Sequence, residues 1–172
     1  MQLKAHLSVP KSSVGNLIIV HENRGLDDHI RNVANRFAAY GFAVVAPDYL
    51  SPIGGSVPDI DANIANIKKI SLDDAIDITT YWSNAISQLS KIEDVSILGF
   101  CWGGGIVNHC ATQVQSLKKV IMFYGVAPDL TLVKNIKASM QLHYAENDDR
   151  INSGKEDYHQ ALKTCGINFQ AY

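Results

Sequence analysis

Short apolar runs alternate along the chain with segments in which apolar residues recur every three or four positions. Runs of the first kind, rich in Val and Ile, are typical of strands buried on both faces of a parallel sheet. Segments of the second kind are typical of helices with one apolar face. The predicted strands are residues 2–9, 17–20, 42–46, 94–98, 118–124, 139–144 and 167–172.

Helices are predicted between these strands, and several helix ends carry local signals. Ser71 followed by Asp74 predicts a helix start, and Ser153 with Glu156 predicts a capping box for the last helix. The alternation of strands and helices predicts an α/β fold with a mostly parallel central sheet and helices on both faces. A length of 172 residues suits a single domain, residues 1–172.

Composition and charge narrow the class of protein. Hydrophobic residues make up 47% of the chain and charged residues 19%, as in ordinary globular proteins. A net charge of −2 gives no reason to expect nucleic acid or an anionic membrane as a partner. Three cysteines without a Cys-x-x-Cys pair argue against a disulfide framework and a cysteine zinc site. We therefore expect a cytoplasmic protein with no metal and no cofactor.

Residues 97–105, Ile-Leu-Gly-Phe-Cys-Trp-Gly-Gly-Gly, join a predicted strand directly to a predicted helix. Gly-x-Cys-x-Gly at such a junction is the pattern of a nucleophile elbow. The turn brings neighbouring backbone so close to the nucleophile that a Cβ has no room, which is why glycines flank it. Cys101 would then be a strong nucleophile as its thiolate. The pattern alone fits equally well a glycine-rich turn around a buried cysteine.

Polar residues follow two other predicted strands. His21, Glu22 and Asn23 come directly after residues 17–20, and residues 145–150, which include Asp148, come after residues 139–144. The carboxyl ends of parallel strands share one edge of a sheet, and ligands bind beyond that edge. The sequence therefore predicts that three strands bring their polar residues to the same edge as Cys101.

These segments, in this order, resemble the dienelactone hydrolase family of the α/β-hydrolase fold; the matching stretches are residues 21–26, 46–48, 99–104 and 144–152. The resemblance implies hydrolysis of a small-molecule ester or lactone through an acyl-thioester on Cys101. It implies that Asp148 is the acid of a Cys-His-Asp triad and that Glu22 contacts the resting thiol. It also implies that the backbone N–H groups of Trp102 and Asn23 form the oxyanion hole.

Several roles stay open on the sequence alone. Glu22 could act as the base for the thiol, or it could cap its local turn or pair with Arg24. Asp148 is favoured over the adjacent Asp149 by its place in the family motif. Arg24 and Arg150 are candidates for binding a substrate carboxylate or oxygen. The alternative is that both are ordinary surface arginines with no role in binding. Residues 48–68 contain no arginine, which argues against dienelactone itself as the substrate.

In the family, the triad histidine lies a few residues beyond the strand that follows the acid-bearing segment. That strand here runs into Tyr172, so the histidine and the last helix are expected to be missing. We therefore interpret the chain as a fragment or truncated product that is inactive or weakly active. Sheet surface left uncovered would favour self-association.

None of the six histidines is an obvious substitute for the triad base. His159 is expected on the surface in the middle of a helix, and His109, two helical turns after the elbow, is expected to point away from it. The alternative function is a non-catalytic binding or interaction protein that retains the hydrolase fold.

Overall fold

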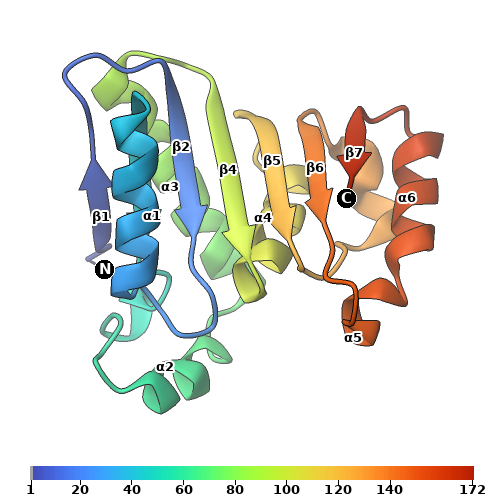
Figure 1. The fold of residues 1–172 in the computed structure, drawn as a ribbon, viewed down its shortest axis with the longest axis horizontal. Coiled ribbons are helices and arrows are strands. Elements are labelled where there is room, and N and C mark those ends of the chain that lie inside the picture. The colour runs from blue at the N-terminus through green and yellow to red at the C-terminus, as the bar shows by residue number, and fades with distance from the viewer. Residues whose placement is uncertain (1) are drawn as a thin grey trace.

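The computed structural model describes residues 2–172, and within them seven strands form one sheet in the order β1-β3-β2-β4-β5-β6-β7 (Figure 1). Only the edge strand β1 is antiparallel to its neighbour; the other strand pairs are parallel. The predicted mostly parallel sheet is confirmed. The strands are β1 (Ala5–Ser8), β2 (Gly15–Val20), β3 (Phe42–Pro47), β4 (Val95–Phe100), β5 (Leu117–Phe123), β6 (Ser139–His143) and β7 (Phe169–Ala171).

Helices cover both faces of the sheet, as predicted. Helix α1 lies on one face, while α3, α4 and α6 lie on the other, and the short helices α2 and α5 lie beyond the carboxyl ends of the strands (Figure 1). The helices are α1 (Asp28–Ala39), α2 (Ile60–Ile67), α3 (Leu72–Ser90), α4 (Trp102–Gln113), α5 (Asp149–Asn152) and α6 (Lys155–Thr164).

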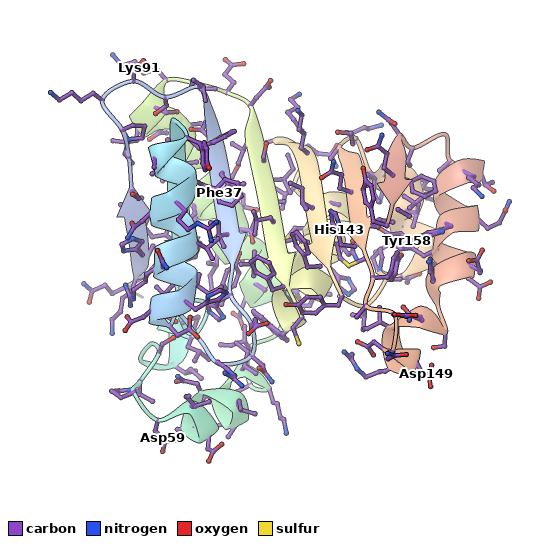
Figure 2. The ribbon with its side chains drawn as sticks, viewed as in Figure 1. Phe37, Asp59, Lys91, His143, Asp149 and Tyr158 are labelled. Carbon is purple, nitrogen blue, oxygen red and sulfur yellow. The ribbon has the colours of Figure 1, made fainter. Side chains whose placement is uncertain are left out.

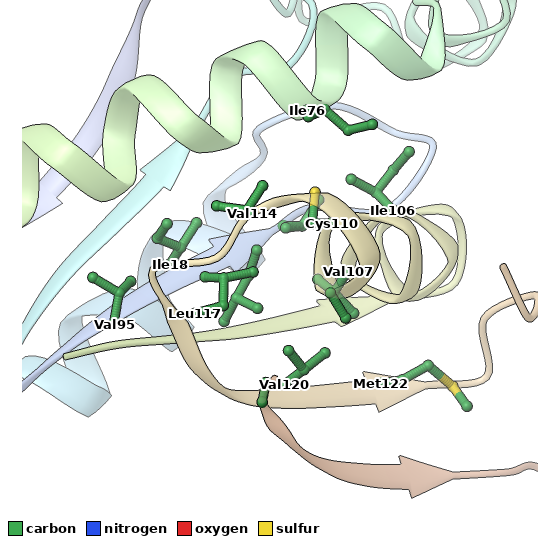
Figure 3. Close-up of a cluster of buried hydrophobic side chains, with 14 of the residues drawn as sticks. Ile18, Ile76, Val95, Ile106, Val107, Cys110, Val114, Leu117, Val120 and Met122 are labelled. Atoms are coloured by element: carbon green, nitrogen blue, oxygen red, sulfur yellow. The ribbon is translucent and has the colours of Figure 1, made fainter. Parts of the chain in front are cut away.

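The apolar strand runs supply a core on each side of the sheet. Ile18 and Ile19 are both fully buried, but successive side chains of a strand point to opposite faces. Ile18 therefore packs toward α3 and α4, in the cluster that Figure 3 shows with Val107 and Cys110. Ile19 packs toward α1. Burial on both faces is what produces the continuous apolar runs in the sequence.

One predicted helix start is confirmed and the other is wrong. Ser71 and Asp74 form the capping box of α3, with the Asp74 N–H donating to Ser71 Oγ at 3.1 Å. Ser153 caps nothing, because α6 begins at Lys155 after Gly154. The reason is α5, which precedes it: Ser153 has helical backbone angles (φ −59°, ψ −29°) at the end of that helix, and a capping residue needs an extended backbone.

On the α1 side, no helix of the described residues covers strands β5 to β7 (Figure 1). Four aromatic rings stack across this half of the sheet, one from each successive strand end: Phe100, Phe123, His143 and Tyr172, with centroid separations of 4.9, 4.5 and 4.8 Å. His143 is labelled on β6 in Figure 2. Self-association through uncovered sheet surface stays a prediction.

Candidate active site

Cys101 occupies a strained turn between β4 and α4. Its backbone angles are φ 55° and ψ −114°, a conformation that side chains rarely adopt, and its N–H donates to the Phe123 carbonyl oxygen at 3.0 Å. A Cβ on Gly99 would lie 2.2 Å from the Gly103 carbonyl oxygen. A Cβ on Gly103 would lie 2.5 Å from the carbonyl oxygen of His21. The flanking glycines are therefore required by close backbone approach, as the elbow pattern predicts.

Two backbone N–H groups beside Cys101 are available to a ligand. Among the hydrogen bonds of residues 2–172, neither the Asn23 N–H nor the Trp102 N–H donates to a protein acceptor. Trp102 is the first residue of α4, and the first N–H groups of a helix have no partner within it. The positive end of the helix dipole favours negative charge at the same place. This arrangement can stabilise a thiolate or an oxyanion.

His21 fixes the loop that carries Glu22 and Asn23. The Tyr49 N–H donates to His21 Nε2 at 3.1 Å, so the ring proton is on Nδ1, which donates to the Glu22 carbonyl oxygen at 2.6 Å. The ring is fully buried and stacks on Trp102 with a centroid separation of 5.7 Å. Burial lowers the pKa of His21 from its ordinary value of 6.5. A buried, neutral imidazole with both nitrogens occupied positions the loop and is not free to act as a base.

A second set of hydrogen bonds anchors this loop to the segment before α2, which the sequence analysis did not identify. Ser56 Oγ accepts from the Leu26 N–H at 2.8 Å and donates to Asp48 Oδ1 at 2.7 Å. Asn63 Nδ2 donates to the Arg24 carbonyl oxygen at 2.8 Å. The positions that hold the loop thus come from residues 48–63, between β3 and the end of α2.

Tyr124 is a further site residue that the sequence analysis missed. Its hydroxyl donates to Glu22 Oε1 at 3.1 Å. Burial is the main cause that raises its pKa to about 12, followed by the charge of Glu22, with a smaller contribution from Cys101. The hydroxyl therefore contacts the carboxylate of Glu22 directly. The ion pairs of residues 2–172 are Arg31 with Asp28 and Arg150 with Asp148, so Glu22 does not pair with Arg24.

Asp148 caps α5, and its carboxylate is shared between two neighbours. Oδ1 accepts from the Ile151 N–H at 3.3 Å, and Oδ2 lies 3.7 Å from Arg150 Nη2. Arg150 lines the same cavity as Cys101. Arg24 is exposed and does not line it. The structure therefore brings Asp148 next to the cavity through Arg150, and Asp149 is more exposed.

Both expectations about the nearby histidines were wrong. His159 is only 8% exposed; its Nε2 lies 3.1 Å from Tyr144 Oη, and its ring packs against Phe169. The reason is that His159 lies on the face of α6 that faces the sheet, beside Tyr158, which Figure 2 labels. His109 does not point away from the elbow but lines the cavity that contains Cys101.

This cavity has a volume of about 650 Å³ and opens beside the elbow. One wall comes from α2 and the start of α3, and the other comes from α4. The residues that line the cavity are Asn23, Ile64, Ile67, Lys68, Ile70, Leu72, Cys101, Trp102, Gly105, Ile106, His109, Val126 and Arg150.

Among residues 2–172, no group of three or more His, Cys, Asp or Glu side chains is arranged to hold a metal ion. None of the helices that the structure describes has the length and apolar character needed to cross a membrane.

Comparison with known proteins gives consistent matches. A family model described as "Dienelactone hydrolase family" matches residues 3–172. A carboxymethylenebutenolidase homolog of Rattus norvegicus is 26% identical over 156 residues, which cover 85% of this chain and 61% of the relative. The chain covers from 48% to 77% of the length of other curated relatives. A dienelactone hydrolase structure from Anabaena variabilis shares the fold, with a TM-score of 0.77 at 17% identity, covering 99% of this chain and 79% of that one.

Proposed function

The chain belongs to the dienelactone hydrolase family, and from this premise we propose that it hydrolyses a carboxylic ester or lactone through Cys101. One observation carries the proposal: Cys101, two N–H groups without protein partners and the Glu22–Tyr124 pair lie together at the carboxyl edge of the sheet. Each of these groups matches one requirement of acyl transfer, namely a nucleophile, an oxyanion hole and a proton acceptor.

In the proposed reaction, Glu22 accepts the thiol proton and the Cys101 sulfur attacks the carbonyl carbon. A free thiol is only a few per cent ionised near neutral pH, so it needs an adjacent base. The C–O bond then breaks, the alcohol leaves with a proton, and an acyl-thioester remains. Water attacks this thioester, releases the acid and restores the thiol. The hydrogen bond from Tyr124 supports this role, because it fixes the Glu22 carboxylate at the edge of the sheet where Cys101 lies.

The developing oxyanion would be stabilised by the N–H groups of Asn23 and Trp102. Removing one such donor typically costs about 2.7–4 kcal/mol of transition-state stabilisation. The His21 hydrogen bond to the Glu22 carbonyl supports the assignment, because it fixes the backbone of the loop that holds Asn23. We assign Asp148 the role of the triad acid, which orients an imidazole toward the thiol. Within residues 2–172, the partners of its carboxylate are the Ile151 N–H and Arg150.

A pre-steady-state assay with p-nitrophenyl acetate tests the proposal. We expect one equivalent of nitrophenolate in a rapid burst, followed by slow turnover, because acylation uses groups already in place and deacylation needs an activated water. Mass spectrometry should locate the acetyl group on Cys101. Cys101→Ala should abolish the burst, while Cys165→Ala, which removes an exposed cysteine, should retain it. An unchanged burst in Cys101→Ala would eliminate Cys101 as the nucleophile.

A second function, binding without catalysis, is favoured by one observation. The Asp148 carboxylate already has two neighbours in the described residues, the Ile151 N–H and the Arg150 guanidinium at 3.7 Å, and both would compete with a triad imidazole for it. On this hypothesis the cavity binds an ester without acylating Cys101. Ester binding measured by calorimetry, without any burst or acetyl-cysteine, would support it over the hydrolase.

A further inference from the structure

The cavity beside Cys101 runs along one side of α4. The residues that α4 contributes follow the i, i+3, i+4, i+7 pattern of one helix face: Trp102, Gly105, Ile106 and His109. His109 follows Cys101 by eight residues, which corresponds to about 12 Å along a helix that rises 1.5 Å per residue. The cavity is thus a trough with the thiol at one end and an imidazole at the other.

The walls of this trough are mainly aliphatic. Ile64 and Ile67 come from α2, and Leu72 comes from the start of α3. Val126 follows β5 on the opposite side. Leu72 is 36% exposed and Val126 is 43% exposed, so apolar surface remains accessible at the trough. A linear hydrocarbon chain would cover this surface and gain from its burial.

The charged groups at the trough do not make it an anion site. The Arg150 guanidinium faces the Asp148 carboxylate at 3.7 Å, so its charge is already compensated. Lys68 is exposed, and lysine at such a rim keeps its ammonium group in water while its stem covers apolar surface. His109 is partly buried, and burial lowers its pKa from the ordinary value while Asp129 opposes this shift. A neutral imidazole can donate a hydrogen bond to an uncharged group or accept one from it.

We propose that the trough binds the linear aliphatic chain of the ester substrate, with its carbonyl at Cys101 and an uncharged hydroxyl end at His109. A chain advances about 1.2 Å per bond, so roughly ten bonds span the distance between the two residues. The proposal rests on the proposed function only in taking Cys101 as the reacting end. It defines the substrate class as esters of medium-length linear chains, with His109 as the residue that selects their length and terminus.

Alkylation of Cys101 by N-alkyl iodoacetamides tests the trough without requiring ester hydrolysis. The sulfur forms a bond to the methylene carbon and iodide leaves, so the rate reports only thiol reactivity and chain binding. In protein carrying Cys165→Ser, we expect the second-order rate to rise roughly fourfold per methylene, the factor for burying one methylene group. The rise should stop when the chain reaches His109. A rate independent of chain length would overturn the proposal.

Substitutions at exposed positions separate the trough from general surface effects. Leu72→Asp and Val126→Asp place a charge on the trough wall at partly exposed sites, so the fold should tolerate them, and both should flatten the dependence on chain length. Leu89→Asp is the control, because Leu89 is 56% exposed and does not line the trough. If all three variants keep the full dependence, the chain does not bind in the trough.

The role of His109 has its own measurement. At the matching length, a probe ending in a hydroxyl should react threefold to tenfold faster than the plain alkyl probe, the range for one hydrogen bond. His109→Leu should abolish or reverse this preference, and an unchanged preference would remove His109 from the proposal.

A normal acetyl burst with no chain-length dependence would refute the trough alone. Chain-length dependence without any burst would refute the hydrolase proposal and leave the trough intact.

Discussion

Gly103→Ala should loosen the contact between α4 and β2, on which the candidate site depends. The added Cβ would lie 2.5 Å from the His21 carbonyl oxygen and 2.6 Å from that of Val20, whereas ordinary contacts begin at 3.4 Å. The shorter distance falls 0.9 Å below that limit, and both oxygens belong to backbone that cannot rotate away. Overpacking of this kind costs about 3 kcal/mol, and alanine recovers up to about 1 kcal/mol of helix propensity. We therefore expect a net loss of about 2 kcal/mol.

Urea unfolding followed by circular dichroism measures this loss, and Gly154→Ala is its matched control. Gly154 precedes the first residue of α6 with φ −97°, and no heavy atom lies within 4 Å of its added Cβ. Its substitution should leave the free energy of unfolding unchanged or raise it by about 0.4–1 kcal/mol.

Gly103→Ala should also slow acylation of Cys101 by p-nitrophenyl acetate. Moving the start of α4 displaces the Trp102 N–H from the oxyanion hole proposed above, and a misplacement of about 1 Å reduces rates by roughly 100-fold. Equal stability of the Gly103 and Gly154 variants would refute the packing argument. Normal acylation in a destabilised Gly103→Ala protein would refute the link to the oxyanion hole.

Three further changes probe the groups around the elbow. Ser56→Ala leaves the Leu26 N–H without its acceptor and should reduce the free energy of unfolding by about 1–3 kcal/mol in urea titrations, whereas Ser153→Ala, at an exposed hydroxyl, should have no measurable effect. Glu22→Gln removes a negative charge beside Tyr124, so spectrophotometric titration should give a Tyr124 pKa below about 12. This pKa should stay above the ordinary value of 10, because burial is the main cause of its rise. Burial lowers the pKa of His21 in the folded protein below 6.5, so near pH 6.5 the imidazole takes up a proton only in the unfolded chain. As the pH falls below about 7, the free energy of unfolding should therefore decrease by up to about 1.4 kcal/mol per pH unit. His21→Gln should remove this contribution to the pH dependence between about pH 7 and pH 5.5.

The features that the sequence predicted correctly are those set by local pattern. Continuous Val and Ile runs indicated strands buried on both faces, and residues 17–20 became part of β2. The elbow could be predicted from Gly99 and Gly103, because only glycine fits where neighbouring backbone approaches this closely. Parallel strands then place their carboxyl ends at one edge, which predicted that Glu22, after β2, and Cys101, after β4, would lie at the same edge of the sheet.

The features that the sequence did not reveal depend on contacts between distant segments. Tyr124 meets Glu22 across 102 positions of sequence, and a tyrosine at the end of a strand carries no local signal for that contact. His159 lies on the buried face of α6, where Tyr144, the residue after β6, supplies a polar partner for its ring. Ser153 satisfied the local capping pattern, but the preceding α5 gave it a helical backbone. In each case tertiary structure overrode a locally reasonable expectation.

At Cys101, the backbone conformation that holds the thiol at the elbow also lowers the stability of the folded protein. Holding a non-glycine residue in such a sparsely populated conformation costs of the order of 1–3 kcal/mol, and every folded molecule carries this strain whether or not a substrate is present. Glycine adopts this conformation freely, so Cys101→Gly should give a more heat-resistant protein with no thiol at the elbow. A library of variants selected for thermal stability alone would therefore tend to lose this cysteine early.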